Sequence, residues 1–357
     1  MIEVSDLHDR WFEDLTIRKA TAGIVSQNAS RLVVRHCHIH DVELGLVATQ
    51  NDDDTVNDYL ITDNVIEGPS VWPRSKGIED ARGIQVTGSG HVIAYNRIRG
   101  FADAIDTMPS IRCEAIDIHN NDLSELTDDG IETDYSQRNV RVFDNRITNA
   151  FQGISTQPVY GGPVYIFRNV MFNIGMEPFK MHNSPSGAIF YHNTIVKAGI
   201  PSLVYTPAAM RNMVSRNNLY VGTSGGRAMI DFTPPAEDCD FDYDGFAAGP
   251  FDSVLRWNGE KYKMFADVKK SAPVYKNIVE LGDGAGLFAS GVRPPQTEKT
   301  AIDAKDADVQ LAPASKAIDA AERLPGFNDD LAGSAPDLGA YELGSKPPHY
   351  GPREPGK

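Results

Sequence analysis

The sequence has no long apolar run, few cysteines and no excess of basic residues. Among its 357 residues there is no stretch of 18 apolar ones, which argues against a membrane-spanning helix. The formal net charge of −15 argues against a nucleic-acid partner, because such a protein needs a basic face for the phosphates. Cys37, Cys113 and Cys239 are widely spaced and lack metal-ligand spacing, so we expect free, buried thiols.

The N-terminal stretch MIEVSDLHDRWFEDL is acidic and interrupted by charges, so it does not have the pattern of a signal peptide. The chain then enters almost directly into a strand-like segment at residues 14–17, without a polar segment to protect the strand edges. We therefore expect the native protein to continue upstream. A secreted or periplasmic location follows if that upstream segment holds an export signal.

A short block centred on asparagine recurs along the chain. Its asparagines follow one another at intervals of 24 or 25 residues after a first interval of 32, and they are Asn64, Asn96, Asn121, Asn145, Asn169, Asn193 and Asn218. A short alternating segment precedes each block, and a second strand follows about eight residues after it, often opened by glycine. Residues 31–232 show no sustained 3.6-residue period, so helical repeats are excluded. The pattern predicts a solenoid of stacked short strands, with the asparagines in an internal hydrogen-bonded ladder.

These asparagine blocks and Gly-Ile strands resemble the right-handed parallel β-helix superfamily of polysaccharide lyases, glycoside hydrolases and epimerases. The resemblance covers roughly residues 12–235 and implies an all-β fold, a right-handed parallel β-helix, at residues 1–240. It specifies the fold better than the reaction, because one fold can host several chemistries.

Irregular segments interrupt and follow the repeat. An insertion at residues 68–77 carries Trp72, which is expected to stack on a sugar ring or to sit half-buried in a plain surface loop. Residues 251–281 carry a helix-like pattern. We expect residues 241–345 to pack on the solenoid and cover its open end, and residues 346–357, rich in proline and glycine, to be disordered.

The repeat also predicts which side chains point out of the coil. If the isoleucines of the second strand point inward, the next residues form an outward column of Gln85, Asp106, Glu132, Ser155 and Lys180. A parallel column two residues later holds Thr87, Met108, Asp134, Gln157 and His182. Several ionisable residues would thus line one open face of a rigid scaffold.

Stacked carboxylates tend to bind a cation or to raise the pKa of one of their members. Asp103, Asp128, Asp129 and Glu132 have a spacing suited to Ca²⁺, with hard oxygen ligands from adjacent rungs. The alternative is that these are ordinary exposed acids, since Asp-Gly is a common turn and the chain has 49 acidic residues.

The acidic cluster further resembles the calcium-dependent, lysine-base pectate lyases of the β-helix class. Asp-Asp-Gly-Ile-Glu at residues 128–132 is similar to the family's Asp-Asp-Gly-x-Asp segment, with Glu132 in place of the last aspartate. Phe-Ala-Asp-Ala at residues 101–104 resembles the family's earlier ligand segment, an aspartate in an Ala-Asp-Gly-like context, and Pro-Phe-Lys at residues 178–180 resembles the Gly-Phe-Lys segment of the base. Lys180 lies two rungs beyond Glu132, where the family pattern has one.

The resemblance implies β-elimination on a uronic-acid polysaccharide. Ca²⁺ would neutralise the substrate carboxylate, and Lys180, with a lowered pKa, would remove the α-proton. The further catalytic candidates are His182, Tyr135 and Asp134. The substrate-binding candidates are Arg82, Trp72, Gln157, Tyr160 and Asp106.

Two other functions stay open from the sequence. A glycoside hydrolase would use paired carboxylates on the same face, either Asp129 with Asp134 or Asp106 with Glu132. A non-catalytic β-helix would bind carbohydrate through aromatic residues near that face. In each case we expect a polysaccharide or oligosaccharide partner and a monomer or weak oligomer.

Overall fold

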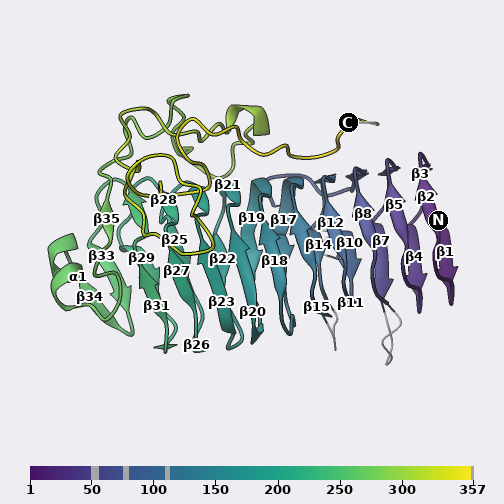
Figure 1. The fold of residues 1–357 in the computed structure, drawn as a ribbon, viewed down its shortest axis with the longest axis horizontal. Helices are drawn as coiled ribbons and strands as arrows, with labels where there is room; N and C mark the ends of the chain where they lie inside the picture. Colours follow the sequence, from purple (N-terminus) through teal and green to yellow (C-terminus); the bar gives the residue numbers. More distant parts are fainter. Residues whose placement is uncertain (50–55, 75–79, 109–112, 355–357) are drawn as a thin grey trace.

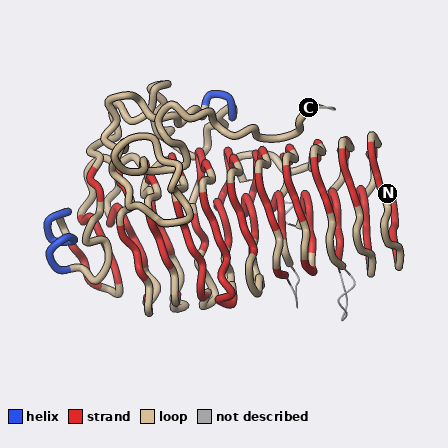
Figure 2. Tube along the Cα trace, in the orientation of Figure 1, coloured by secondary structure: helices blue, strands red, loops and turns tan. Residues whose placement is uncertain are grey.

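The computed structural model describes residues 1–49, 56–74, 80–108 and 113–354. Short strands wind into one long coil, with the N-terminus at one end and helix α1 (Phe265–Ser271) at the other (Figure 1). The strands of successive turns pair in parallel, and an irregular C-terminal segment lies along one side of the coil (Figure 2). The architecture is therefore the predicted parallel β-helix.

Three faces make up the coil, and we name them by what lies on them. The acidic face consists of β1 (Ile2–Ser5), β4 (Ala22–Gln27), β7 (Leu44–Thr49), β10 (Arg82–Val86), β14 (Asp103–Asp106), the second halves of β17 (Asp122–Glu132) and β19 (Arg146–Ser155), and β22 (Phe179–Lys180). Next to β22 it continues through β25 (Ser202–Val204), β29 (Ala228–Phe232) and β33 (Ser253–Trp257).

The tail face carries the C-terminal segment. Its strands are β3 (Thr16–Arg18), β6 (His38–His40), β9 (Val65–Glu67), β13 (Arg97–Arg99), the first halves of β17 and β19, β21 (Val170–Ile174), β24 (Thr194–Val196), β28 (Leu219–Val221), β32 (Gly245–Ala247) and β35 (Val279–Glu280).

The third face closes the coil. Its strands are β2 (Trp11–Glu13), β5 (Val33–Arg35), β8 (Leu60–Thr62), β12 (Val92–Ala94), β16 (Asp117–His119), β18 (Val140–Phe143), β20 (Tyr160–Phe167), β23 (Ser186–Tyr191), β26 (Met210–Arg211), β27 (Val214–Arg216), β30 (Ala236–Glu237) and β31 (Asp240–Asp242). The remaining short elements are β11 (Gly88–Ser89), β15 (Cys113–Glu114), β34 (Glu260–Tyr262) and the 3₁₀ turn Ala304–Asp306.

The interior is filled by side chains that alternate along the strands and repeat from rung to rung. On the acidic face Ile84 pairs with Ile105, Ile105 with Ile131, and Ile131 with Ile154, and all four are fully buried. Gly130 precedes one of these isoleucines because the coil has no room there: an added Cβ would lie 2.6 Å from a carbonyl oxygen of the next rung. The glycine therefore allows the strands to approach closely.

The predicted asparagine ladder is confirmed. From Asn64 to Asn193 each side-chain amide donates to the amide oxygen of the next ladder asparagine, at donor–acceptor distances of 2.8 to 3.1 Å. Asn218 donates to the carboxylate of Asp244, 2.9 Å away, which ends the ladder. The residue directly before each ladder member has a positive φ, for example 59° at Asp63 and 54° at Tyr243. The residue with the positive φ changes the direction of the chain at the corner of the rung. The side-chain amide of the next residue then forms the hydrogen bonds at that corner.

The solenoid extends further than the expected boundary at residue 240. β32 pairs with β28, and β33 pairs with β29, so the coil continues through the range expected to be irregular. The helix-like pattern of residues 251–281 forms β33, its antiparallel partner β34 and only the short helix α1. Val268 of α1 is buried in the main core, so this segment closes the C-terminal end of the coil.

The residues after this cap follow the tail face instead of covering an end. Leu287, Phe288 and Leu338 pack with Phe172 and Val196 of the tail face in a second hydrophobic cluster. The coil thus has apolar side chains both inside and on this outer face. The irregular segment buries the outer set.

The prediction that residues 346–357 are disordered is wrong for residues 346–354. Arg353 donates to both carboxylate oxygens of Asp63, at 2.9 and 2.6 Å, and its guanidinium lies over the ring of Tyr95. The Gly351 N–H donates to the Asn120 carbonyl. These contacts fix a Pro/Gly-rich segment that has little internal structure of its own. Residues 355–357 lie outside the described ranges.

Cys37, Cys113 and Cys239 form no disulfide with one another. Cys37 and Cys113 are buried, as predicted, whereas Cys239 is half-buried. In the described part of the chain, no helix has the length and apolar character needed to cross a membrane.

The end of the ladder predicts a pH-dependent stability. Burial raises the pKa of Asp244 to about 7 from an ordinary 3.8, although Ser215 and Asn218 donate to it. The folded state therefore holds a proton that the unfolded state releases, and the free energy of unfolding should decline as the pH rises from about 4 to about 7. We expect Asp244→Asn, which keeps an acceptor for Asn218, to remove the share of this decline that Asp244 contributes, so that the slope becomes shallower, and to raise the melting temperature at pH 8. Melting curves at both pH values test this, and an unchanged pH slope in the variant would contradict it.

Candidate active site

The outward column predicted from the repeat is present on the acidic face. Gln85 pairs with Asp106, Asp106 with Glu132, Glu132 with Ser155, and Ser155 with Lys180, one rung apart in each case. The expectation that this column is openly exposed is wrong. Asp106 and Ser155 have no accessible surface, and Glu132 and Lys180 keep only 6 and 8% of theirs. The ionisable groups lie outside the hydrophobic interior, yet they are shielded from bulk water.

Strand β17 bends around the corner between the tail face and the acidic face. Its pairing with β19 shifts register between Leu126 and Asp129, which is the mark of a β-bulge. Asp128 and Asp129 therefore lie in a continuous, irregular strand and not in the turn that the sequence suggested. The bulge re-aims the side chain of Asp129 toward the acidic face.

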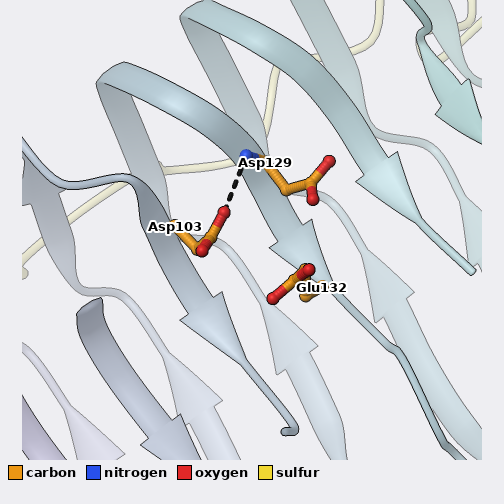
Figure 3. A group of neighbouring side chains, drawn as sticks. All are labelled: Asp103, Asp129 and Glu132. Atoms are coloured by element: carbon orange, nitrogen blue, oxygen red, sulfur yellow. Dashed lines mark hydrogen bonds between the residues drawn. The ribbon is translucent and has the colours of Figure 1, made fainter. Parts of the chain in front are cut away.

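Three carboxylates from two neighbouring rungs meet at this bulge (Figure 3). Asp103, Asp129 and Glu132 each offer an oxygen atom, and these atoms all lie within 4.8 Å of one another. The backbone N–H of Asp129 donates to Oδ1 of Asp103 over 2.8 Å, which holds the two rungs together. Asp128, the fourth predicted metal ligand, is outside this group and is half-buried. We call Asp103, Asp129 and Glu132 the carboxylate triad.

Two basic residues flank the carboxylate triad. Nζ of Lys180 lies 2.7 Å from Oδ2 of Asp129 and 3.9 Å from Oε1 of Glu132. Two rungs separate the backbones of Glu132 and Lys180, as predicted, and the long lysine side chain spans that gap.

Arg82 binds the other side of the cluster. Its guanidinium lies 2.9 Å from Oδ2 of Asp103 and 3.1 Å from Oδ2 of Asp106. Asp106 also accepts from the Gln85 amide over 2.7 Å. Arg82 and Asp106 were predicted to bind substrate. In the structure they form an ion pair with each other.

Negative charge exceeds positive charge in this site, and burial amplifies the imbalance. Burial raises the pKa of Asp103, Asp106, Asp129 and Glu132, and the neighbouring carboxylates raise that of Glu132 further, to about 11. The pKa of Asp129 rises less, to about 6, because Lys180 stabilises its anion. Glu132 therefore carries a proton at neutral pH unless another cation approaches.

The prediction of a lowered Lys180 pKa is wrong for the protein without a bound cation. Burial by itself lowers the pKa of Lys180, but the charges of Asp129, Asp134 and Asp128 outweigh it and hold the pKa above its ordinary value. The ammonium is thus the favoured form as long as the carboxylates have no other counterion.

The second column contains two more of the predicted residues, Asp134 and His182. Asp134 is fully buried and accepts from the Ser155 hydroxyl and the Gln157 N–H, both over 2.6 Å. Burial raises its pKa to about 7. His182 lies with Nε2 2.9 Å from Oε2 of the buried Glu177. Gln157 of the same column is half-buried.

The predicted aromatic residues lie in two separate places. Tyr135 and Tyr160 lie near each other, with ring centroids 6.4 Å apart, and Tyr160 is 52% exposed. Trp72 is 7% exposed, and its indole N–H donates to the Glu298 carbonyl of the C-terminal segment. The expectation that Trp72 stacks on a sugar is therefore wrong, because the ring anchors the tail. Residues 75–77 of the same insertion lie outside the described ranges.

The sequence did not reveal that Lys180 contacts Asp129 or that Glu177 contacts His182. Strand register aligns Lys180 with Glu132, and only the bulge in β17 brings Asp129 within reach. Glu177 precedes the strand outside the outward columns, so the repeat gave no reason to single it out.

The ion pair between Lys180 and Asp129 yields a stability prediction. Lys180→Met should lower the free energy of unfolding by about 3–5 kcal/mol, the usual cost of leaving one partner of a buried pair uncompensated. The double variant Lys180→Met/Asp129→Asn should recover most of that loss. Chemical denaturation in the presence of a chelator measures both, and equal losses in the single and double variants would refute the coupling.

A comparison with models of known protein families agrees with this fold. Residues 2–157 match a family model described as a right handed beta helix region. A search of curated proteins gives no match. Among solved structures, the crystal structure of pectate lyase Pel9A is similar, with a TM-score of 0.41 and 15% sequence identity over 93% of this chain and 70% of that chain. The chain is a right-handed parallel β-helix, as the resemblance of its asparagine blocks and Gly-Ile strands implied.

Proposed function

We propose that this protein is a polysaccharide lyase that cleaves a uronic-acid-containing glycan by β-elimination, outside the cytoplasm. The observation that carries the proposal is the contact of Lys180 with the carboxylate triad on a rigid face. β-Elimination needs a base for the proton α to a carboxyl group and a counterion for the developing charge. The acidic face brings an amine and an acidic cluster together within one ion-pair distance.

The oxygen atoms of the triad support binding of a divalent cation. Asp129 Oδ1 and Glu132 Oε2 are buried and have no hydrogen-bond partner among the described residues. Such unpaired buried oxygens are costly, and hard oxygen donors are the ligands that Ca²⁺ prefers. Asp103, Asp129 and Glu132 would hold the ion. When bound, it would neutralise a substrate carboxylate and acidify the neighbouring proton.

Lys180 would act as the base at Nζ. The carboxylates that raise its pKa would lose this effect once their charge is taken up by another cation, so Lys180 would then reach its neutral form more easily. Arg82, with 19% of its side chain accessible, would orient an incoming carboxylate. The exposed Tyr160 and the half-buried Gln157 would contact the sugar ring.

Lys180→Arg tests the base without removing the ion pair. Arginine keeps a positive charge beside Asp129 but does not deprotonate in proteins, so the variant should fold and lose at least about 100-fold in turnover. The assay is the ultraviolet absorbance of the unsaturated product, on a panel of uronic-acid polysaccharides with and without Ca²⁺.

The matched control for this experiment is Lys305→Arg. Lys305 also pairs with an aspartate, Asp303, but lies exposed on the C-terminal segment. This variant should retain full turnover. Activity of Lys180→Arg equal to that of the wild type would show that Lys180 is not the base.

Cation binding can be measured without turnover. Calorimetric titration with Ca²⁺ should show one site, and Asp103→Asn should weaken it by about tenfold or more, since it removes one charged ligand. Asp117→Asn, which alters an ion pair with Arg141 on the third face, serves as the control and should bind as the wild type does. Absence of Ca²⁺ binding in the wild-type protein would refute the cation site.

A glycoside hydrolase is the second candidate, favoured by one observation. Glu132 holds its proton at neutral pH, as a general acid must, and Asp129 and Asp134 lie in the same cluster as candidate bases. New reducing ends without ultraviolet absorbance, from a neutral or acidic glycan and in the presence of chelator, would favour hydrolysis over elimination.

A further inference from the structure

We propose that the acidic face contains a second binding site, on the C-terminal side of Lys180, which takes a carboxylate of the same glycan at a distance from the reacting sugar. Arg227, Arg256 and Tyr205 form this site, which we call the arginine subsite. The inference rests on the proposed function for its ligand class, a uronic-acid oligosaccharide. Its position, charge and exposure come from the structure.

Two arginines of the arginine subsite share a single carboxylate. Nε of Arg227 lies 2.7 Å from Oδ2 of Asp231, and Nε of Arg256 donates to Oδ1 of the same residue. Asp231 is fully buried, so it belongs to the scaffold and cannot move away. One carboxylate cannot neutralise two guanidinium groups, so the pair retains a positive charge in a protein whose net charge is −15.

A third cation increases this local excess. Arg256 and Lys261 are direct cross-strand partners in the hairpin of β33 and β34, so their side chains leave the sheet on the same side. Like charges in such a position repel each other unless an anion lies between them. This excess of positive charge favours an anionic ligand.

Arg256 has a donor that the protein does not use. Its Nη2 atom is buried and has no hydrogen-bond partner among the described residues. A buried N–H without a partner is costly, and a ligand carboxylate can accept from it. The side chain of Arg227 is 47% accessible, so a ligand can reach the two arginines from solvent.

Tyr205 supplies the apolar part of the subsite. It is 57% exposed, and the guanidinium of Arg227 lies 5.6 Å from the centre of its ring. An exposed aromatic ring beside arginine fits a sugar acid, whose ring has an apolar face and whose carboxylate is charged.

Glu177 connects the arginine subsite to the candidate active site. One carboxylate oxygen of Glu177 accepts from the backbone N–H of Tyr205 over 2.8 Å, and the other lies 2.9 Å from His182. Glu177 is fully buried, so this link is rigid. Strands β22, β25, β29 and β33 follow one another along the coil (Figure 1). With rungs about 4.8 Å apart, Tyr205 lies about one rung beyond Lys180, and the two arginines lie roughly 10–15 Å from it, a few sugar units along an extended glycan.

The test measures binding and turnover as a function of ligand length. The probes are oligogalacturonates of graded length, with cello-oligosaccharides of the same lengths as neutral probes. Arg227→Gln leaves the buried pair of Arg256 and Asp231 in place, and Tyr205→Ala removes no ion pair. In each variant we expect the Kd for long oligogalacturonates to rise about tenfold, with a smaller effect as the ligand becomes shorter.

The matched control is Arg211→Gln, which removes an arginine paired with Glu237 on the third face and should leave Kd and turnover unchanged. Length-dependent weakening without any elimination in the wild type would retain the subsite and refute the proposed lyase. Elimination with the same Kd and KM in Arg227→Gln at all lengths would refute the subsite. The arginine subsite would also be refuted if Arg227→Gln lost affinity equally for the neutral probes, or if the wild type bound no oligogalacturonate.

Discussion

The ladder of buried amides from Asn64 to Asp244 is the interaction on which the rest of the molecule depends. Each member satisfies the corner of its own rung and donates to the next, so it sets the turn and the stacking distance together. All amides donate in one direction along the coil, and the final acceptor is a carboxylate. An aligned chain of donors favours a negative or strongly accepting group at its end. Asp244 is therefore the natural terminus of the series.

A scaffold held this tightly can keep like charges close together. In a flexible loop, Asp103, Asp129 and Glu132 would separate to lower their repulsion. On adjacent rungs the strand pairing holds them, so the repulsion appears as raised pKa values and as ion pairs with Arg82 and Lys180. The site therefore keeps an excess of negative charge that favours a bound cation, because the strand pairing prevents the carboxylates from moving apart.

How far the sequence predicted this structure depends on the range of the interactions. The asparagine period and the alternation of side chains predicted the coil, the ladder and the outward column, because these features follow from a local period of two residues and one rung. The bulge that brings Asp129 to Lys180 was not predictable, since an extra residue in a strand leaves no periodic mark. The anchoring of Trp72 by Glu298 joins residues far apart in the chain, and only tertiary packing decides it.

The bidentate pair of Arg353 and Asp63 joins two positions that are 290 residues apart. In a solenoid each rung touches only its neighbours, so rungs near one end can open without disturbing the other end. The C-terminal segment changes this behaviour. When the rung of Asp63 opens, this segment is also detached, and it is packed against the other half of the coil. The C-terminal segment thus couples rungs that do not touch each other, so the two halves of the coil unfold together.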